Sequence, residues 1–204
     1  TNVAANPNPL CAGQTLTLSA DGDVGNTFNW GGPNAFTQSG NPINRNNVNA
    51  SMAGNYTVTQ SSPAGCTSAA SLSVNVVVNP LPSVTAGSSS ASYCAGTTIL
   101  LTSTPSGGTL GYTYVWSGPQ SFPSLTQNPS ISNATTLMSG IYQVELTDNN
   151  GCTASASTNF ITVQPALSVT AGSNSPVCAG GTINLNSSPG GGTPTYTFTW
   201  SGPS

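Results

Sequence analysis

The sequence predicts an all-β protein made of antiparallel β-sandwiches that follow one another along the chain. Short segments alternate polar and apolar residues, a set of motifs recurs about every 84 residues, and no segment has a helical period of useful length. Alternation with a period of two is typical of strands with one buried face. Short strands separated by turns at intervals of about 8–12 residues favour a sandwich.

The repeat sets the expected domain organisation. Five landmarks occur in one order: Cys-Ala-Gly, Trp-x-Gly-Pro, Asn-Pro-(x)-Ile, Gly-x-Tyr-x-Val and Gly-Cys-Thr. They predict two complete units and the opening part of a third, divided at short proline-marked joints into residues 1–79, 80–165 and 166–204. We expect joints this short to hold neighbouring units at a restricted angle. We also expect the sequence to be a window on a longer chain.

The expected strands follow the same order in each complete unit. In the first, residues 15–18 read Thr-Leu-Thr-Leu and residues 56–59 read Tyr-Thr-Val-Thr. In the second, residues 112–116 place three aromatic side chains on one face, and residues 142–146 alternate again. The sequence Asp-Asn-Asn-Gly at residues 148–151 predicts a hairpin turn that leads into Cys152 and a further strand.

The third part shows the opening strands of the same pattern. Residues 183–186 alternate loosely, and residues 196–200 place Tyr196, Phe198 and Trp200 on one face of a predicted strand.

Large aromatic residues recur at fixed places in the units. We expect them to pack in the cores of the sandwiches and not to stack on a ligand: Trp30, Trp116, Trp200, Tyr56 and Tyr142. The Gly-x-Tyr pattern is similar to the tyrosine corner of immunoglobulin-like sandwiches, in which the hydroxyl fixes a crossover loop. The predicted fold class is therefore all-β, with tandem immunoglobulin-like antiparallel β-sandwiches stacked end to end.

The charge content excludes most chemistries. Charged residues make up 2% of the chain, with Arg45 as its one basic residue, four acidic residues and no histidine; about 25% is usual. A nucleic-acid partner would require clustered Lys and Arg, and acid–base catalysis usually requires His or paired carboxylates. We expect no enzyme activity, no catalytic residue, no cofactor and no metal. Asp21-Gly22-Asp23 is interpreted as a polar turn, because the other units lack acidic residues there and calcium requires about 6–8 oxygen ligands.

The motif set resembles the immunoglobulin-like or PKD-like tandem repeats of giant Bacteroidota surface adhesins, including the SprB type of gliding bacteria. The resemblance covers the whole chain. It implies a secreted, extracellular segment of a fibre or stalk used in adhesion, gliding or prey capture. The expected partners are other copies of the same chain, lateral or end to end, together with neighbouring repeats and surface glycans, with no nucleic acid. Membrane insertion is not expected, since no apolar stretch approaches about 18 residues.

One other function fits the composition, a non-catalytic carbohydrate-binding module of a secreted enzyme. That function requires an exposed aromatic platform, for which Tyr112 and Tyr196 are the candidates.

The five cysteines allow two disulfide patterns. Pairing within units would join Cys11 to Cys66 and Cys94 to Cys152. Pairing between units would join Cys11 to Cys152, and Cys66, Cys94 and Cys178 would then bond to repeats outside this window. We prefer the second pattern. In a sandwich of this type the two cysteines of one unit stand at opposite ends, more than about 20 Å apart, while a disulfide requires Cα atoms within about 7 Å.

Overall fold

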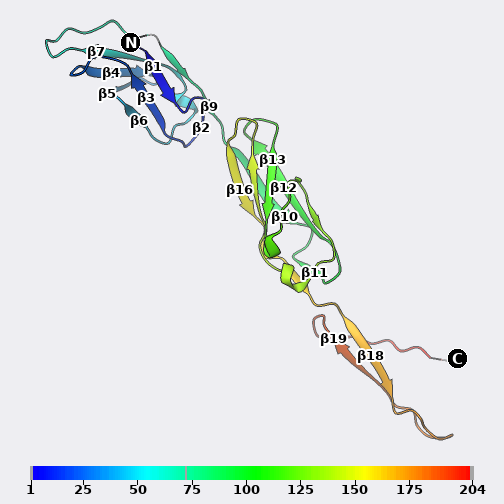
Figure 1. The fold of residues 1–204 in the computed structure, drawn as a ribbon. Coiled ribbons are helices and arrows are strands. Elements are labelled where there is room, and N and C mark those ends of the chain that lie inside the picture. The colour runs from blue at the N-terminus through cyan, green and yellow to red at the C-terminus, as the bar shows by residue number, and fades with distance from the viewer. Residues whose placement is uncertain (1, 72, 203–204) are drawn as a thin grey trace. The chain divides into compact units, whose positions relative to one another are not determined.

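The computed structural model describes residues 2–71 and 73–202, and strands and their connecting loops make up nearly all of it (Figure 1). The helical content of this part of the chain is three 3₁₀ turns: η1 (Ala50–Met52), η2 (Pro119–Ser121) and η3 (Thr136–Met138). The chain divides into two compact units. The first contains Thr1–Val84, Pro105–Thr113 and Leu146–Ala154, and the second contains Thr85–Thr104, Tyr114–Glu145 and Ser155–Ser204.

Residues 1–79 form two principal sheets and a short parallel pair. The first sheet has the order β1-β3-β6, and the second has the order β5-β4-β7-β8. A short strand, β2, runs parallel to β9. The bounds are β1 (Val3–Asn6), β2 (Leu10–Cys11), β3 (Leu16–Ala20), β4 (Thr27–Gly32), β5 (Phe36–Ser39), β6 (Ile43–Arg45), β7 (Gly54–Ser61), β8 (Val74–Val76) and β9 (Val78–Asn79).

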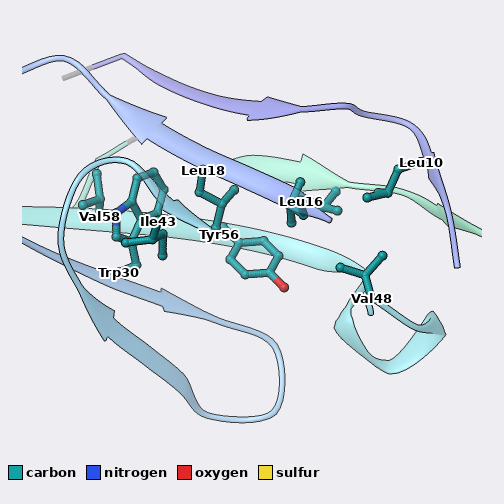
Figure 2. Close-up of a cluster of buried hydrophobic side chains, with 9 residues drawn as sticks. Leu10, Leu16, Leu18, Trp30, Ile43, Val48, Tyr56 and Val58 are labelled. Carbon is teal, nitrogen blue, oxygen red and sulfur yellow. The ribbon is translucent and has the colours of Figure 1, made fainter. Parts of the chain in front are cut away.

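The alternating sequence of β3 explains its place in the sandwich. Leu16 and Leu18 are fully buried, and Thr17 faces outwards, where its hydroxyl donates to the Asn44 side chain of the neighbouring strand at 2.9 Å. Apolar side chains from both sheets meet in one core (Figure 2): Leu10, Leu16, Leu18, Trp30, Ile43, Val48, Tyr56, Val58 and Val76. Burial of this apolar surface is the main favourable contribution to the stability of the sandwich.

Residues 80–165 repeat this plan, except that an isolated bridge between Trp116 and Ser124 takes the place of β5. The sheets have the orders β10-β12-β14 and β13-β15-β16, and β11 runs parallel to β17. Ile99, Leu101, Trp116, Tyr142 and Val144 are buried, at the places where the first repeat buries its Leu, Trp, Tyr and Val side chains. The bounds are β10 (Pro82–Ser88), β11 (Ser92–Cys94), β12 (Ile99–Gly107), β13 (Thr113–Ser117), β14 (Ser130–Ile131), β15 (Gln143–Thr147), β16 (Thr153–Ser157) and β17 (Thr162–Gln164).

The strand order is that of an immunoglobulin-like sandwich without its usual cross-sheet disulfide. A buried Trp lies on the third long strand, and a Tyr lies near the start of β7, as in antibody domains. Antibody domains carry their second cysteine two residues after that Tyr. Here the position holds Val58 in the first repeat and Val144 in the second, both buried. The cores are therefore sealed by apolar packing, and the cysteines lie elsewhere.

The third part of the chain differs from the sequence prediction. Its strands β18 (Ser168–Ser173) and β19 (Leu185–Gly190) pair antiparallel in a two-stranded sheet. Residues 196–200, predicted as a strand, have no strand structure, and Trp200, predicted as a core residue, is 47% exposed. The physical reason is the same for both: within the described residues, no second sheet pairs with this segment or covers the face of the hairpin.

Candidate functional site

The two tryptophans of the complete repeats are structural. Trp30 and Trp116 are each 1% exposed. The Trp30 Nε1–H donates to the carbonyl oxygen of Gly40 at 3.0 Å, and the Trp116 Nε1–H donates to that of Gln127 at 3.2 Å. Their ring faces are therefore closed to a sugar, and their polar atoms are satisfied by the backbone. The core placement predicted for these two residues is confirmed.

The tyrosine corner is also present in both repeats. The hydroxyl of Tyr56 donates to the carbonyl oxygen of Met52 at 2.7 Å, and that of Tyr142 donates to Met138 at 2.8 Å. In each case the bond closes over the 3₁₀ turn that precedes the strand, so the tyrosine fixes the loop between the two sheets. Burial raises the pKa of the Tyr142 hydroxyl above its ordinary value.

Two of the recurring motifs fit directly against each other. A Cβ atom at Gly118 of Trp-x-Gly-Pro would lie 2.3 Å from Cδ1 of Tyr142, and one at Gly140 of Gly-x-Tyr would lie 2.6 Å from Cγ of Pro119. Gly140 also has a φ of +153°, which disfavours a side chain. Gly118 is therefore required by the close approach of the Tyr142 ring, and Gly140 by the close approach of Pro119.

The tyrosines proposed for a carbohydrate platform are tied to their own loops. The Tyr112 hydroxyl donates to the carbonyl oxygen of Gly107, and the Tyr196 hydroxyl donates to that of Gly191. Both side chains are half-buried. Each tyrosine therefore has a local structural role: Tyr112 fixes the loop that follows β12, and Tyr196 fixes the loop that follows β19.

The described residues bring two cysteine loops together, and these form the candidate functional site. Cys11 and Cys152 are joined by a disulfide, with a Cα–Cα distance of 5.7 Å and a sequence separation of 141 residues. That distance is within the usual range for disulfides. The bonded pair is the one preferred from the sequence, and it links a loop of residues 1–79 to a loop of residues 80–165. Both loops belong to the first compact unit.

Three consecutive backbone N–H groups hold the Cys11 loop in place. The N–H of Cys11 donates to Oε1 of Gln14 at 2.8 Å. The next two N–H groups donate outwards, Ala12 to the carbonyl of Asn79 at 2.9 Å and Gly13 to that of Val48 at 2.7 Å. These hydrogen bonds fix the loop to β9 through Asn79 and to the loop that carries the buried Val48, independently of the disulfide.

A buried carboxylate organises the Cys152 loop. Oδ1 of Asp148 accepts the N–H groups of Asn150 and Cys152, each at 2.9 Å, and Oδ2 accepts the N–H of Thr109 at 2.9 Å. The N–H of Gly151 donates to the Asp148 carbonyl at 3.0 Å, which closes the predicted turn. The side chain thus fixes both its own turn and the neighbouring loop, and Cys152 is held 2% exposed.

The environment of Asp148 determines its ionisation. Burial of the carboxylate raises its pKa, but the backbone hydrogen bonds from Thr109, Cys152 and Asn150 outweigh this effect and hold the pKa below its ordinary value. The group is therefore ionised at neutral pH, and it stabilises the turn as a charged acceptor of three hydrogen bonds.

Arg45, the single basic residue, is used inside the first repeat. Its guanidinium carbon lies 3.9 Å from the ring centroid of Phe36 and 5.6 Å from that of Tyr56, and its Nη1 donates to the Tyr56 hydroxyl. In strand register Arg45 pairs with Leu16, and the second repeat places Ile131 opposite Ile99 in the same way. Arg45 therefore takes the place of an apolar residue and covers the aromatic pair.

The other three cysteines have free, exposed thiols: Cys66, Cys94 and Cys178. The bonds to further repeats that the sequence analysis assigned to them stay a prediction. Sequence reasoning did not identify Asp148 or Arg45 as important residues. The four-residue spacing from Asp148 to Cys152 was visible, but the hydrogen bond to Thr109 depends on the tertiary fold.

Two further features of the described residues bear on function. No group of three or more His, Cys, Asp and Glu side chains there could hold a metal ion. Among the same residues, no helix has the length and apolar character needed to cross a bilayer.

Comparison with protein families gives one match, which covers the first repeat. Residues 1–80 match the family described as Ig-like domain, CHU_C associated. The fold is all-β and immunoglobulin-like. No curated protein matches the chain.

Several solved structures are similar to the chain. The amphioxus IgVJ-C2 molecule is 17% identical with a TM-score of 0.37, over 74% of this chain and 97% of that one. The three N-terminal domains of the bacteriophage RB49 outer capsid protein Hoc are 17% identical with a TM-score of 0.40, over 94% and 69%. The ectodomain of mouse nectin-like molecule 4 is 15% identical with a TM-score of 0.37, over 80% and 64%.

Proposed function

We propose that this chain is a load-bearing segment of a long extracellular repeat protein that forms a cell-surface fibre or stalk. The immunoglobulin-like fold, the disulfide and the match of the first repeat support a secreted, non-catalytic domain. Residues 1–79 and 80–165 are its two complete repeats, and residues 166–204 open a third. A role in adhesion, gliding or prey capture of the kind served by SprB-type adhesins is part of this proposal, as are surface glycans as a target.

The covalent connection between Cys11 and Cys152 carries the proposal. A force applied to the two ends of the chain passes from Cys11 directly to Cys152 through the disulfide. Residues 12–151, which include most of both sandwiches, are then outside the path of tension. The strands of these two repeats outside this loop, β1, β2, β16 and β17, remain in the path of tension, whereas the strands within it cannot be extended while the bond is intact. An extracellular location suits such a device, since disulfides persist in oxidising compartments.

The low charge fits the same function. With charged residues at 2%, copies of the chain can lie close together without strong charge repulsion, and their contacts depend little on salt. Surface pairs such as Thr17 with Asn44, and Thr15 with Asn46 at 3.0 Å, show polar residues taking the place of ion pairs on the exposed faces.

Single-molecule force spectroscopy on the full chain tests this function. The oxidised chain, pulled from its termini, should show no extension from residues 12–151. Added reductant should release a length of roughly 460–500 Å, which is 141 residues at about 3.3–3.6 Å each, less the 5.7 Å that separates the two Cα atoms in the folded chain. A Cys11→Ser variant should show the long extension without reductant. Equal extension of the oxidised chain and this variant would contradict a load-bearing role for the bond.

A further inference from the structure

A small hollow lies on the surface of the second repeat, beside the edge strands β10 and β16 of its two sheets. It has a volume of about 400 Å³. One wall is the end of β10 and the kink that follows it, residues 86–91, and the other wall is formed by Ser157, Asn159 and Phe160. Every lining residue belongs to the second repeat and to the second compact unit. Ligand-binding clefts in proteins have volumes of about 300–1,000 Å³, so the hollow is large enough for a small ligand.

The first repeat closes the corresponding place with an asparagine side chain. Asn8 and Ala91 each stand three residues before the cysteine of Cys-Ala-Gly. In the first repeat, the Asn8 side chain donates to the carbonyl of Asn75 at 2.8 Å and accepts the N–H of Val77 at 2.9 Å. In the second repeat, Ala91 has only a methyl group, and its backbone carbonyl accepts the N–H of Thr162 at 2.9 Å. The space that an amide fills in the first repeat is therefore open in the second.

A bulge in the second repeat places an aromatic ring at this hollow. Ile161 exchanges two backbone hydrogen bonds with Gly140, and the N–H of Thr158 donates to the carbonyl two residues after Gly140, each at 2.8 Å. Asn159 and Phe160 therefore stand opposite one residue of the neighbouring strand, where the first repeat pairs its strands one to one. Bulges at sheet edges change the direction of side chains. Phe160 is 58% exposed, and its side chain lines the hollow.

The serine-rich kink presents fixed hydrogen-bonding groups to the hollow. The Ser88 hydroxyl donates to the carbonyl of Ser90 at 2.6 Å. The N–H of Ser90 donates to the Tyr93 hydroxyl at 3.1 Å, and that hydroxyl also bonds to the Ser89 hydroxyl at 2.9 Å. A hydroxyl that donates one hydrogen bond keeps lone pairs that can accept another. Together with the exposed amide of Asn159, which has donors and an acceptor, the kink suits a ligand that carries hydroxyl groups.

The chemistry of the two walls defines the class of ligand. No lining residue carries a charge, so a charged ligand would lose hydration without gaining an ion pair. A sugar ring has C–H groups on its face, which can stack on Phe160, and hydroxyl groups at its edge, which can bond to the kink and to Asn159. We propose that the hollow binds a neutral saccharide in this way. The proposal rests on surface glycans as the target of the proposed fibre, and it adds the place where they bind and their charge.

Nuclear magnetic resonance of the backbone amides of the full chain tests the site. The neutral probes are cellotetraose, chitotetraose and mannotetraose, and the anionic probe is tetragalacturonate. At least one neutral probe should shift the amide signals of residues 89–91 and 159–160 in a saturable manner, while tetragalacturonate should leave them unchanged. The shifted signals locate the site directly, and their dependence on probe concentration gives the dissociation constant.

Three single variants separate the parts of the site. Phe160→Ala should raise the dissociation constant roughly tenfold or more, because the stacked ring is lost. Ala91→Asn should weaken binding to a similar degree with the ring in place, because it restores the amide that fills this space in the first repeat. Ile141→Ala is the matched control: Ile141 is an exposed apolar residue opposite the bulge that does not line the hollow, so binding should be unchanged. All three positions are exposed, and unchanged signals from the rest of the chain show that each variant is folded.

Several results would overturn the proposal. These are the absence of shifts at residues 89–91 and 159–160 with every neutral probe, binding that survives unchanged in Phe160→Ala or Ala91→Asn, and binding of tetragalacturonate as tight as that of the neutral probes. Shifts of the same signals on raising the protein concentration without sugar would show that a second copy of the chain occupies the hollow. None of these outcomes alters the force measurement on the disulfide, so the two proposals can fail separately.

Discussion

The carboxylate of Asp148 accepts the backbone N–H of Cys152, four residues later, at 2.9 Å, and it positions the sulfur that bonds to Cys11. The same carboxylate accepts the N–H of Thr109 from another loop. Asp148→Asn should therefore lower the free energy of unfolding by roughly 1–2 kcal/mol, because one amide group cannot replace an acceptor of three hydrogen bonds. Denaturant unfolding of both proteins measures this difference in free energy. Ser62→Ala is the control: Ser62 stands four residues before Cys66, as Asp148 does before Cys152, but its side chain accepts the N–H of Cys66 at 3.3 Å, so its loss should cost less.

The ionisation of Asp148 also predicts a dependence on pH. Hydrogen bonds hold its folded pKa below the ordinary value of 3.8, so its contribution to stability is complete above about pH 3.8 and is lost as the pH falls through the folded pKa. The difference in unfolding free energy between wild type and Asp148→Asn should shrink on acidification over that range. A difference that stays constant down to pH 2 would show that the charge of Asp148 has no part in stabilising the loop.

The tryptophans offer a comparison within one chain. Trp116→Ala should destabilise its sandwich by roughly 3–5 kcal/mol, because it empties a core position of a side chain that is 1% exposed. Trp200→Ala should change stability by less than about 0.5 kcal/mol, since Trp200 is 47% exposed. Thermal unfolding followed by circular dichroism distinguishes the two. Equal losses in both variants would contradict the assignment of Trp116 to the core.

Arg45 should tolerate an apolar replacement better than truncation. Arg45→Ala removes the cation over Phe36 and the donor to the Tyr56 hydroxyl, and it should cost roughly 1 kcal/mol. Arg45→Ile restores the residue type that the second repeat carries at the paired position, Ile131, and should recover part of that loss. Chemical denaturation in parallel measures the order. If the isoleucine variant is less stable than the alanine variant, the charge itself is the important property.

The sequence was sufficient for the all-β class, the tryptophan and tyrosine cores of the two complete repeats, the turn before Cys152 and the bonded cysteine pair. These features could be predicted because burial follows the two-residue period of a strand and because the motifs recur at one spacing. The prediction for Trp200 was wrong because alternation shows which face of a strand is apolar, but not whether another sheet covers it. The roles of Asp148 and Arg45 depend on contacts with residues that are distant in the sequence, and the local sequence pattern gives no information about such contacts.

The central claim is that the covalent link joins one repeat to the next and does not lie within either of them. Disulfide mapping of the oxidised full chain, digested with chymotrypsin and analysed by mass spectrometry without reduction, tests this most directly. The structure predicts a linked pair of peptides that contain Cys11 and Cys152. A linked pair that contains Cys11 and Cys66, or Cys94 and Cys152, would contradict the account.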